Sequence, residues 1–139
     1  MNRPFPQPQR VERLERPMEE QRQFVCITCP MGCNIEAVVR DGQAVSISGA
    51  RCKRGAEFVR EELTAPKRML TTTVRVRGGV LPLVPVRSSA PLPKARLLEV
   101  AAHLRQVVLD APVEEHQVVC ANVLDTGVDM IASRALKRA

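Results

Sequence analysis

Tryptophan and tyrosine are absent from this chain, and phenylalanine occurs only three times. A core must therefore be built from Val, Leu, Ile and Ala, and no aromatic platform is available for stacking nucleic-acid bases. The basic residues are spread along the chain and interleaved with acidic ones, so the net charge of +6 does not indicate nucleic-acid binding. A mildly basic surface suits an acidic protein partner or an anionic cofactor equally well.

Long apolar runs and targeting signals are also missing. No stretch approaches the roughly 20 apolar residues that a membrane-spanning helix needs. The first 22 residues contain neither an apolar signal-peptide region nor a twin-arginine pair. We therefore expect a cytoplasmic protein without a membrane span, in a compartment where thiols stay reduced.

Cysteine is scarce but concentrated. Four of the five cysteines form the pattern C-x2-C-x3-C-x18-C, at Cys26, Cys29, Cys33 and Cys52. In a reducing compartment such a group indicates a metal site rather than disulfides, and the odd total also argues against a complete disulfide set. Three closely spaced thiolates on one loop can bind three corners of a compact cluster, and a fourth can close the opposite side. A [4Fe–4S] cluster needs four thiolates.

Zinc is the alternative metal. It also accepts four thiolates, but its structural sites more often use two separate C-x2–4-C pairs. Here the second segment, RCKRG, contributes Cys52 alone. The spacing therefore favours an iron–sulfur cluster and leaves a zinc-stabilised protein-interaction module open.

The neighbours of the cysteines suit a cluster as well. Pro30 and Gly32 allow a tight loop whose N–H groups point at sulfur, and Ile27 and Met31 would limit water access. Lys53 and Arg54 flank Cys52. Positive charge there would favour the reduced, more negative cluster, or would dock a partner.

The chain divides into three segments. Residues 1–22, rich in Pro, Gln, Arg and Glu, are expected to form a flexible arm. Residues 23–70 form a cysteine-rich metal- or cluster-binding segment, and residues 71–139 form a C-terminal segment. The fold class is α+β, with β-hairpins packed against one long helix.

Turn signals and periodicity predict the elements. Asp41-Gly42 favours a two-residue turn and predicts a hairpin over residues 34–49. A short helix is expected over 55–63, ending before Pro66. Two strands are expected around Gly78-Gly79, with Val74 and Val76 on one face. Because of Pro82 and Pro85, the second of these strands should be an edge strand or irregular.

The longest helix is predicted over residues 93–109. Its apolar stripe is Leu97, Ala101, Leu104 and Val108. Two short strands around residues 125–127 end the chain.

The remaining reactive side chains have ordinary explanations. Cys120 lies among β-branched residues and is interpreted as a small buried hydrophobe. His103 and His116 are assigned structural or surface roles. No nucleophile stands beside a base and no glycine-rich phosphate loop occurs, so no catalytic residue is assigned.

The ordered combination CITCPMGC, VVRDGQAVSISG, RCKRG and TAPKRML resembles the N-terminal iron–sulfur segment of molybdopterin oxidoreductases. The resemblance implies that Cys26, Cys29, Cys33 and Cys52 bind [4Fe–4S]. The rest of the chain is too short for the molybdopterin-binding domains, and Arg54 stands where that family usually has Lys. Molybdenum chemistry is therefore not expected.

Residues 24–134 resemble a bacterial family of unknown function, DUF1667. The resemblance rests on the cysteine motif and on LTTTVRVRGG, PLVPVRSSAPLPK and NVLDTGVDMIASR. Members of that family often occur beside glycerol-3-phosphate-dehydrogenase-like and FAD/NAD(P)-dependent oxidoreductases. This implies an accessory electron-transfer subunit that works with a flavoprotein partner.

Overall fold

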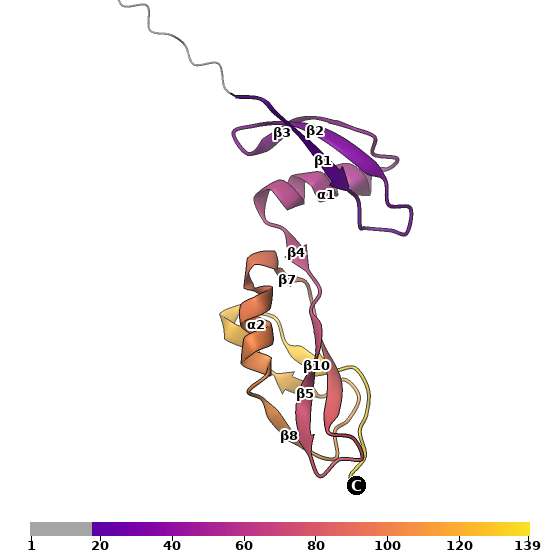
Figure 1. Ribbon diagram of the computed structural model, residues 1–139, viewed down its shortest axis with the longest axis vertical. Helices are drawn as coiled ribbons and strands as arrows, with labels where there is room; N and C mark the ends of the chain where they lie inside the picture. Colours follow the sequence, from indigo (N-terminus) through magenta and orange to yellow (C-terminus); the bar gives the residue numbers. More distant parts are fainter. Residues whose placement is uncertain (1–17) are drawn as a thin grey trace, which may run out of the picture.

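Within residues 18–139, the buried hydrophobic side chains fall into two separate clusters, one for each of two lobes that follow each other along the long axis (Figure 1). The computed structural model describes residues 18–139. We call residues 18–64 the N-terminal lobe and residues 67–139 the C-terminal lobe. The predicted arm lies outside the described residues up to position 17, and its last part, from Glu20, belongs to a strand.

The secondary-structure elements are, in chain order, β1 Glu20–Val25, β2 Asn34–Arg40, β3 Gln43–Ser48, α1 Lys53–Thr64, β4 Lys67–Arg68, β5 Thr71–Arg77, β6 Leu83–Ser88, β7 Leu92–Pro93, the 3-10 turn η1 Lys94–Arg96, α2 Leu97–Leu104, β8 Val108–Asp110, β9 Val118–Cys120, the 3-10 turn η2 Val123–Asp125 and β10 Met130–Ala132. No helix within residues 18–139 is long and apolar enough to cross a bilayer.

The N-terminal lobe is a three-stranded antiparallel sheet, in the order β1-β2-β3, with α1 on one face. Asp41 and Gly42 both have positive φ, as the two-residue turn between β2 and β3 requires, so the predicted hairpin is confirmed. Along β2 every second residue is buried, and these side chains pack with Phe58 and Val59 of α1. The short helix before Pro66 is also confirmed, two residues longer at its start than predicted.

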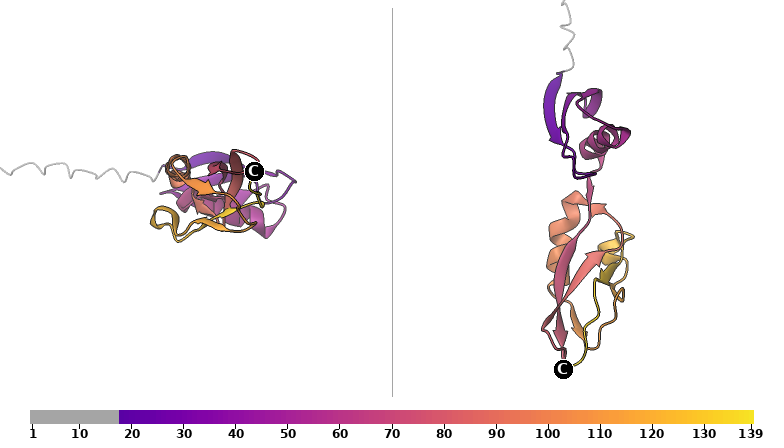
Figure 2. Two further views of the ribbon diagram at one scale, coloured as in Figure 1. Left: turned by 90° about the horizontal axis from the view of Figure 1, so that it is seen from below. Right: turned by 90° about the vertical axis from the view of Figure 1, so that its right-hand side faces the viewer.

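The C-terminal lobe is a five-stranded sheet, in the order β8-β5-β6-β10-β9, with α2 on one face. Figure 2 shows α2 running alongside β5 in the side view. Val74 and Val76 are buried, as their alternation with arginine predicts, and they belong to the same core cluster as Val100 and Leu104 of the helix. The α+β class is therefore confirmed.

The helix predicted over residues 93–109 is shorter than predicted and, at eight residues, shorter than α1, which has twelve. Its α-helical part ends at Leu104, and Val108 lies in β8, where it pairs in parallel with Arg75 of β5. The helix buries Val100 and Leu104, whereas Val108 is 39% exposed, so the predicted stripe is wrong at its last position. β-branched residues at 107 and 108 fit the sheet edge better than a helix end.

β6 is not an edge strand. It lies between β5 and β10. The carbonyl of Pro85 accepts a hydrogen bond from Ser133 N, just beyond the last β10 pair, Ala132 with Val86. The missing N–H of Pro85 therefore falls where that ladder ends, and the sheet tolerates a proline inside a central strand.

Candidate metal centre

The first three predicted ligands lie on one closed loop between β1 and β2. Val25 pairs with Asn34 at the strand ends, and Cys26 N donates to Cys33 O over 2.9 Å. Gly32, with φ +57°, supplies the left-handed position that turns the chain back. The antiparallel pairing thus places Cys26 and Cys33 at the base of the loop and Cys29 away from it.

The thiols differ in their exposure to solvent. Cys26 is 5% exposed and belongs to the core of the N-terminal lobe, while Cys33 packs against that core. Cys29 is half-buried and Cys52 is exposed. Cys26 Sγ lies 3.0 Å from the Thr28 hydroxyl, a contact that the cysteine spacing did not indicate.

The chain comes back to this loop shortly before Cys52, because Gly49 at the end of β3 lies close to the backbone of Asn34. Gly49 has φ +84°, and a Cβ at this position would lie 2.4 Å from Asn34 O. Only glycine permits this approach to the residue that follows Cys33. The chain then enters α1 with Cys52 as its N-cap, in extended conformation and without a side-chain cap hydrogen bond. In the sequence, the signal for this return of the chain was a glycine directly after an alternating strand.

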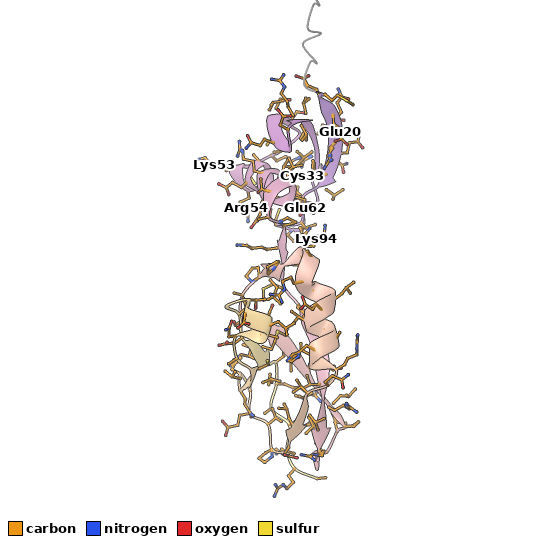
Figure 3. All side chains as sticks on the ribbon, turned by 90° about the vertical axis from the view of Figure 1, so that its left-hand side faces the viewer. Glu20, Cys33, Lys53, Arg54, Glu62 and Lys94 are labelled. Atoms are coloured by element: carbon orange, nitrogen blue, oxygen red, sulfur yellow. The ribbon has the colours of Figure 1, made fainter. Side chains whose placement is uncertain are left out.

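Local charge favours the thiolate form of Cys52. The backbone N–H of Gly55 and the guanidinium of Arg54 lower the pKa of this thiol. The same group raises the pKa of Arg54, with smaller contributions from Cys29 and Cys26. Arg54 therefore has three of the four predicted ligands in its electrostatic surroundings. Figure 3 shows Lys53 and Arg54 at the side of the N-terminal lobe and Cys33 further inside it.

The structure does not form a finished metal site. Across residues 18–139, no three side chains of the Cys, His, Asp and Glu types are arranged to hold one metal ion. All five cysteines are free. Their chemistry fits either candidate, because four unpaired thiols at one end of a lobe are the donor set of both [4Fe–4S] and structural zinc. The ligand assignment stays a prediction.

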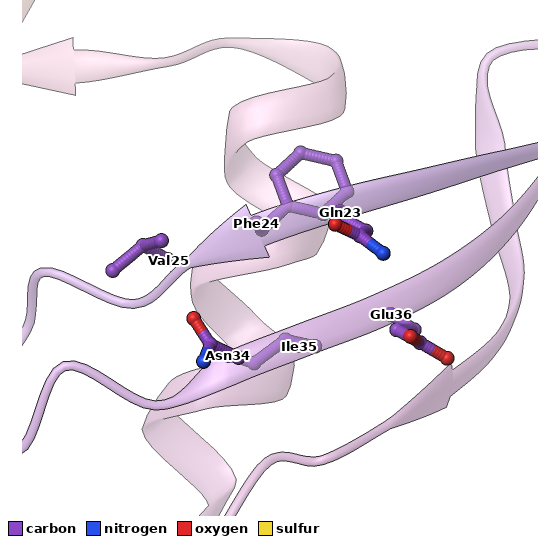
Figure 4. A pocket seen from close by; sticks show the side chains of 6 residues that line it. All are labelled: Gln23, Phe24, Val25, Asn34, Ile35 and Glu36. Carbon is purple, nitrogen blue, oxygen red and sulfur yellow. The ribbon is translucent and has the colours of Figure 1, made fainter.

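Ile27 and Met31 do not shield these thiols, contrary to expectation. Their exposed fractions are 59% and 63%. Both lie on the irregular loop, where no neighbouring element covers them. A shallow pocket of about 360 Å³ opens beside the loop base, where Val25 and Asn34 face each other (Figure 4). Its walls are strand residues without a nucleophile–base pair.

Cys120, His103 and His116 lie in the C-terminal lobe. Cys120 is half-buried against the core, and its Sγ lies 3.9 Å from His103 Nε2. His116 is exposed. The fold therefore gives Cys120 a histidine neighbour that its sequence position did not indicate.

These features define a two-lobed α+β protein with a thiol-rich end, and comparison with known proteins gives its family. The family described as "Protein of unknown function (DUF1667)" matches residues 53–134, more than half of the chain. The chain belongs to this family. The match begins immediately after Cys52, so the cysteine segment lies outside it.

One solved structure and the curated proteins complete the comparison. The NMR structure of Clostridium perfringens protein CPE0013 shares 31% sequence identity with this chain and has a TM-score of 0.49. The similarity covers 52% of this chain and 87% of that protein. No curated protein matches the chain.

Proposed function

We propose that this protein is an iron–sulfur electron-transfer subunit that works with a flavin-dependent, glycerol-3-phosphate-dehydrogenase-like oxidoreductase. Cys26, Cys29, Cys33 and Cys52 would hold a [4Fe–4S] cluster, which accepts and returns one electron at a time. Substrate chemistry belongs to the flavoprotein, which takes up a two-electron hydride and can release its electrons singly.

The observation that carries the proposal is the position of Arg54 beside Cys52 and within electrostatic reach of Cys29 and Cys26. A cation there offsets the repulsion between thiolates that share a site. It also stabilises the extra negative charge that a bound cluster gains on reduction.

The start of α1 supports an anionic occupant. Its first turn contains Lys53 and Arg54 and no acidic residue. Cations are unfavourable at a helix N-terminus, because the helix dipole places partial positive charge there. Thiolates or a cluster beside this turn would compensate both the dipole and the two side chains. The Thr28 hydroxyl, 3.0 Å from Cys26 Sγ, can donate a hydrogen bond to a thiolate at that position.

Metal and sulfide analysis of anaerobically purified protein tests the proposal. We expect iron and acid-labile sulfide in near-equal amounts, about four of each per chain. The protein should be brown and should bleach on reduction. Stoichiometric zinc without sulfide would refute the cluster and would support the alternative function, a zinc-stabilised module that assembles the same complex without carrying electrons.

A further inference from the structure

Three exposed apolar side chains are gathered at the cysteine loop. Val25, Ile27 and Met31 are 58%, 59% and 63% exposed. Ile27 and Met31 lie on the loop that the Cys26 N to Cys33 O bond closes at its base, and Val25 is the last residue of β1 before that loop. Single exposed apolar residues are normal on a surface, but a local group of them marks an interaction site.

Basic side chains lie next to this loop. Arg51, Lys53 and Arg54 are all exposed. Among residues 18–139, none of the three forms an ion pair with a carboxylate. The close approach of Gly49 to Asn34 O brings the segment that contains these residues to the base of the loop. The surface therefore has an apolar part beside a strip of uncompensated positive charge.

We propose that this surface, defined by Val25, Ile27, Met31, Arg51, Lys53 and Arg54 and called the loop patch, docks the flavoprotein partner. The identity of the partner rests on the proposed function. The partner's complementary surface is apolar at the centre and carries carboxylates on one side. An apolar centre with charged surroundings is the usual arrangement of a specific protein interface.

The location of the patch strengthens this choice of occupant. The apolar residues stand beside or between the cysteines in the chain, so a partner that buries them also covers the thiols. Burial would supply the water exclusion that Ile27 and Met31 do not provide in the free chain. A partner seated elsewhere on the elongated molecule would leave the thiols in solvent and distant from its flavin.

A double variant, Ile27→Ser with Met31→Ser, tests the loop patch. The probe is a purified glycerol-3-phosphate-dehydrogenase-like flavoprotein from the same organism, and the dissociation constant is measured by titration calorimetry. We expect the constant to rise at least about tenfold, since buried apolar anchors dominate binding energy. Val80→Ser is the matched control, because Val80 is 57% exposed in the loop between β5 and β6 of the other lobe. Its constant should stay within about twofold, as for residues outside an interface.

The outcomes separate this inference from the proposed function. Unchanged affinity in the double variant, or no binding by the wild-type chain, overturns the loop patch. Sedimentation showing a wild-type dimer that the double variant loses would identify a second copy as the occupant and would also overturn it. Iron and sulfide are measured on the same samples. Zinc without sulfide together with a lost affinity refutes the proposed function and keeps the docking surface.

If circular dichroism shows that the double variant is unfolded, the single variant Ile27→Ser replaces it with the same criterion. Because Ile27 is 59% exposed, its truncation removes little core packing.

Discussion

Glu62 Oε1 and Lys94 Nζ lie 2.8 Å apart, and this ion pair joins the two lobes. The other carboxylate oxygen of Glu62 accepts a hydrogen bond from Arg68, also at 2.8 Å. The Arg68 guanidinium lies over the Phe58 ring, 5.9 Å from its centroid. Figure 3 shows Glu62 at the end of the N-terminal lobe with Lys94 directly beyond it. One carboxylate of α1 therefore holds two cations of the C-terminal lobe.

Glu62→Gln should lower the free energy of unfolding by about 1 kcal/mol. The Glu62 side chain is only 15% exposed, so this pair is better shielded from water than an ordinary surface pair. The amide preserves the shape but leaves two cations without their counter-charge. Urea denaturation followed by circular dichroism measures the loss.

Glu99→Gln is the matched control for this variant. Glu99 pairs with Arg96 on a more exposed site, with its side chain 58% exposed. We expect a loss below about 0.5 kcal/mol there. Equal losses in the two variants would contradict a special role for Glu62 in joining the lobes.

The contribution of Glu62 should depend on pH. Burial raises the pKa of this carboxyl, but the hydrogen bonds from Lys94 and Arg68 outweigh it and hold the pKa below the ordinary value of 4.5. A carboxyl with a depressed folded-state pKa stabilises the protein fully above its unfolded-state value, and this stability is lost as the pH falls through the folded-state value. The difference in thermal midpoint between wild type and Glu62→Gln should be constant near neutral pH. It should begin to shrink below about pH 4.5, where the carboxyl of the unfolded chain takes up a proton, and should disappear at lower pH, where the folded carboxyl is protonated as well. A difference that persists unchanged at pH 3 would contradict this account.

Gly49→Ala should destabilise the N-terminal lobe by about 2 kcal/mol or more. A methyl group at this position would lie 2.4 Å from Asn34 O, and the residue has φ +84°. Gly42→Ala separates the two causes, because Gly42 has φ +77° but no atom within 4 Å of the added methyl. Its loss should be about 1 kcal/mol, from backbone strain alone. Equal losses in the two variants would show that the contact with Asn34 O does not contribute to the destabilisation by Gly49→Ala.

The elements that sequence patterns predicted were those with local signals. The Asp41-Gly42 turn needs two positive φ angles, and the alternation of Val74 and Val76 with arginine gives one buried face whatever the neighbouring strand. Both are properties of a few adjacent residues. The strands β1, β4, β7 and β8 were missed because they are short or depend on a distant pairing partner.

The misplaced helix end shows the same limit. The pattern from Leu97 to Val108 has helical spacing throughout, yet Val108 gains a parallel pairing with Arg75, more than thirty positions away. Local periodicity contains no information on that partner. At the candidate site, the sequence predicted a ligand set of four cysteines, and this assignment stays a prediction. Gly49 after an alternating strand was visible in the sequence, but its approach to Asn34 and the exposure of Ile27 and Met31 depend on backbone positions in three dimensions.

Replacing any of Cys26, Cys29, Cys33 and Cys52 by Ser should reduce iron and sulfide in anaerobically purified protein to below about half of the wild-type content, since each cluster iron needs its own thiolate. Cys120→Ala should leave both contents unchanged. Cys120 packs in the C-terminal lobe beside His103, in a different hydrophobic cluster from Cys26. Loss of iron in Cys120→Ala would show that a ligand has been mistaken for a packing residue.

Charge reversal at Lys53 and Arg54 should slow electron delivery more than it reduces cluster content. The double variant Lys53→Glu with Arg54→Glu places acidic residues in the first turn of α1, which the helix dipole favours, so the helix should be retained. Complementary charge chiefly raises the association rate, and salt weakens that effect. Stopped-flow absorbance of the cluster, after mixing with substrate-reduced flavoprotein, should show a rate at least about tenfold lower at low ionic strength and a smaller difference at high ionic strength.

The matched control is the double variant Arg134→Glu with Lys137→Glu. It changes the net charge equally at exposed positions near the C-terminus and should leave the rate nearly unchanged. Equal slowing in both double variants would assign the effect to net charge. An unchanged rate in the Lys53 and Arg54 variant would remove these residues from the docking surface.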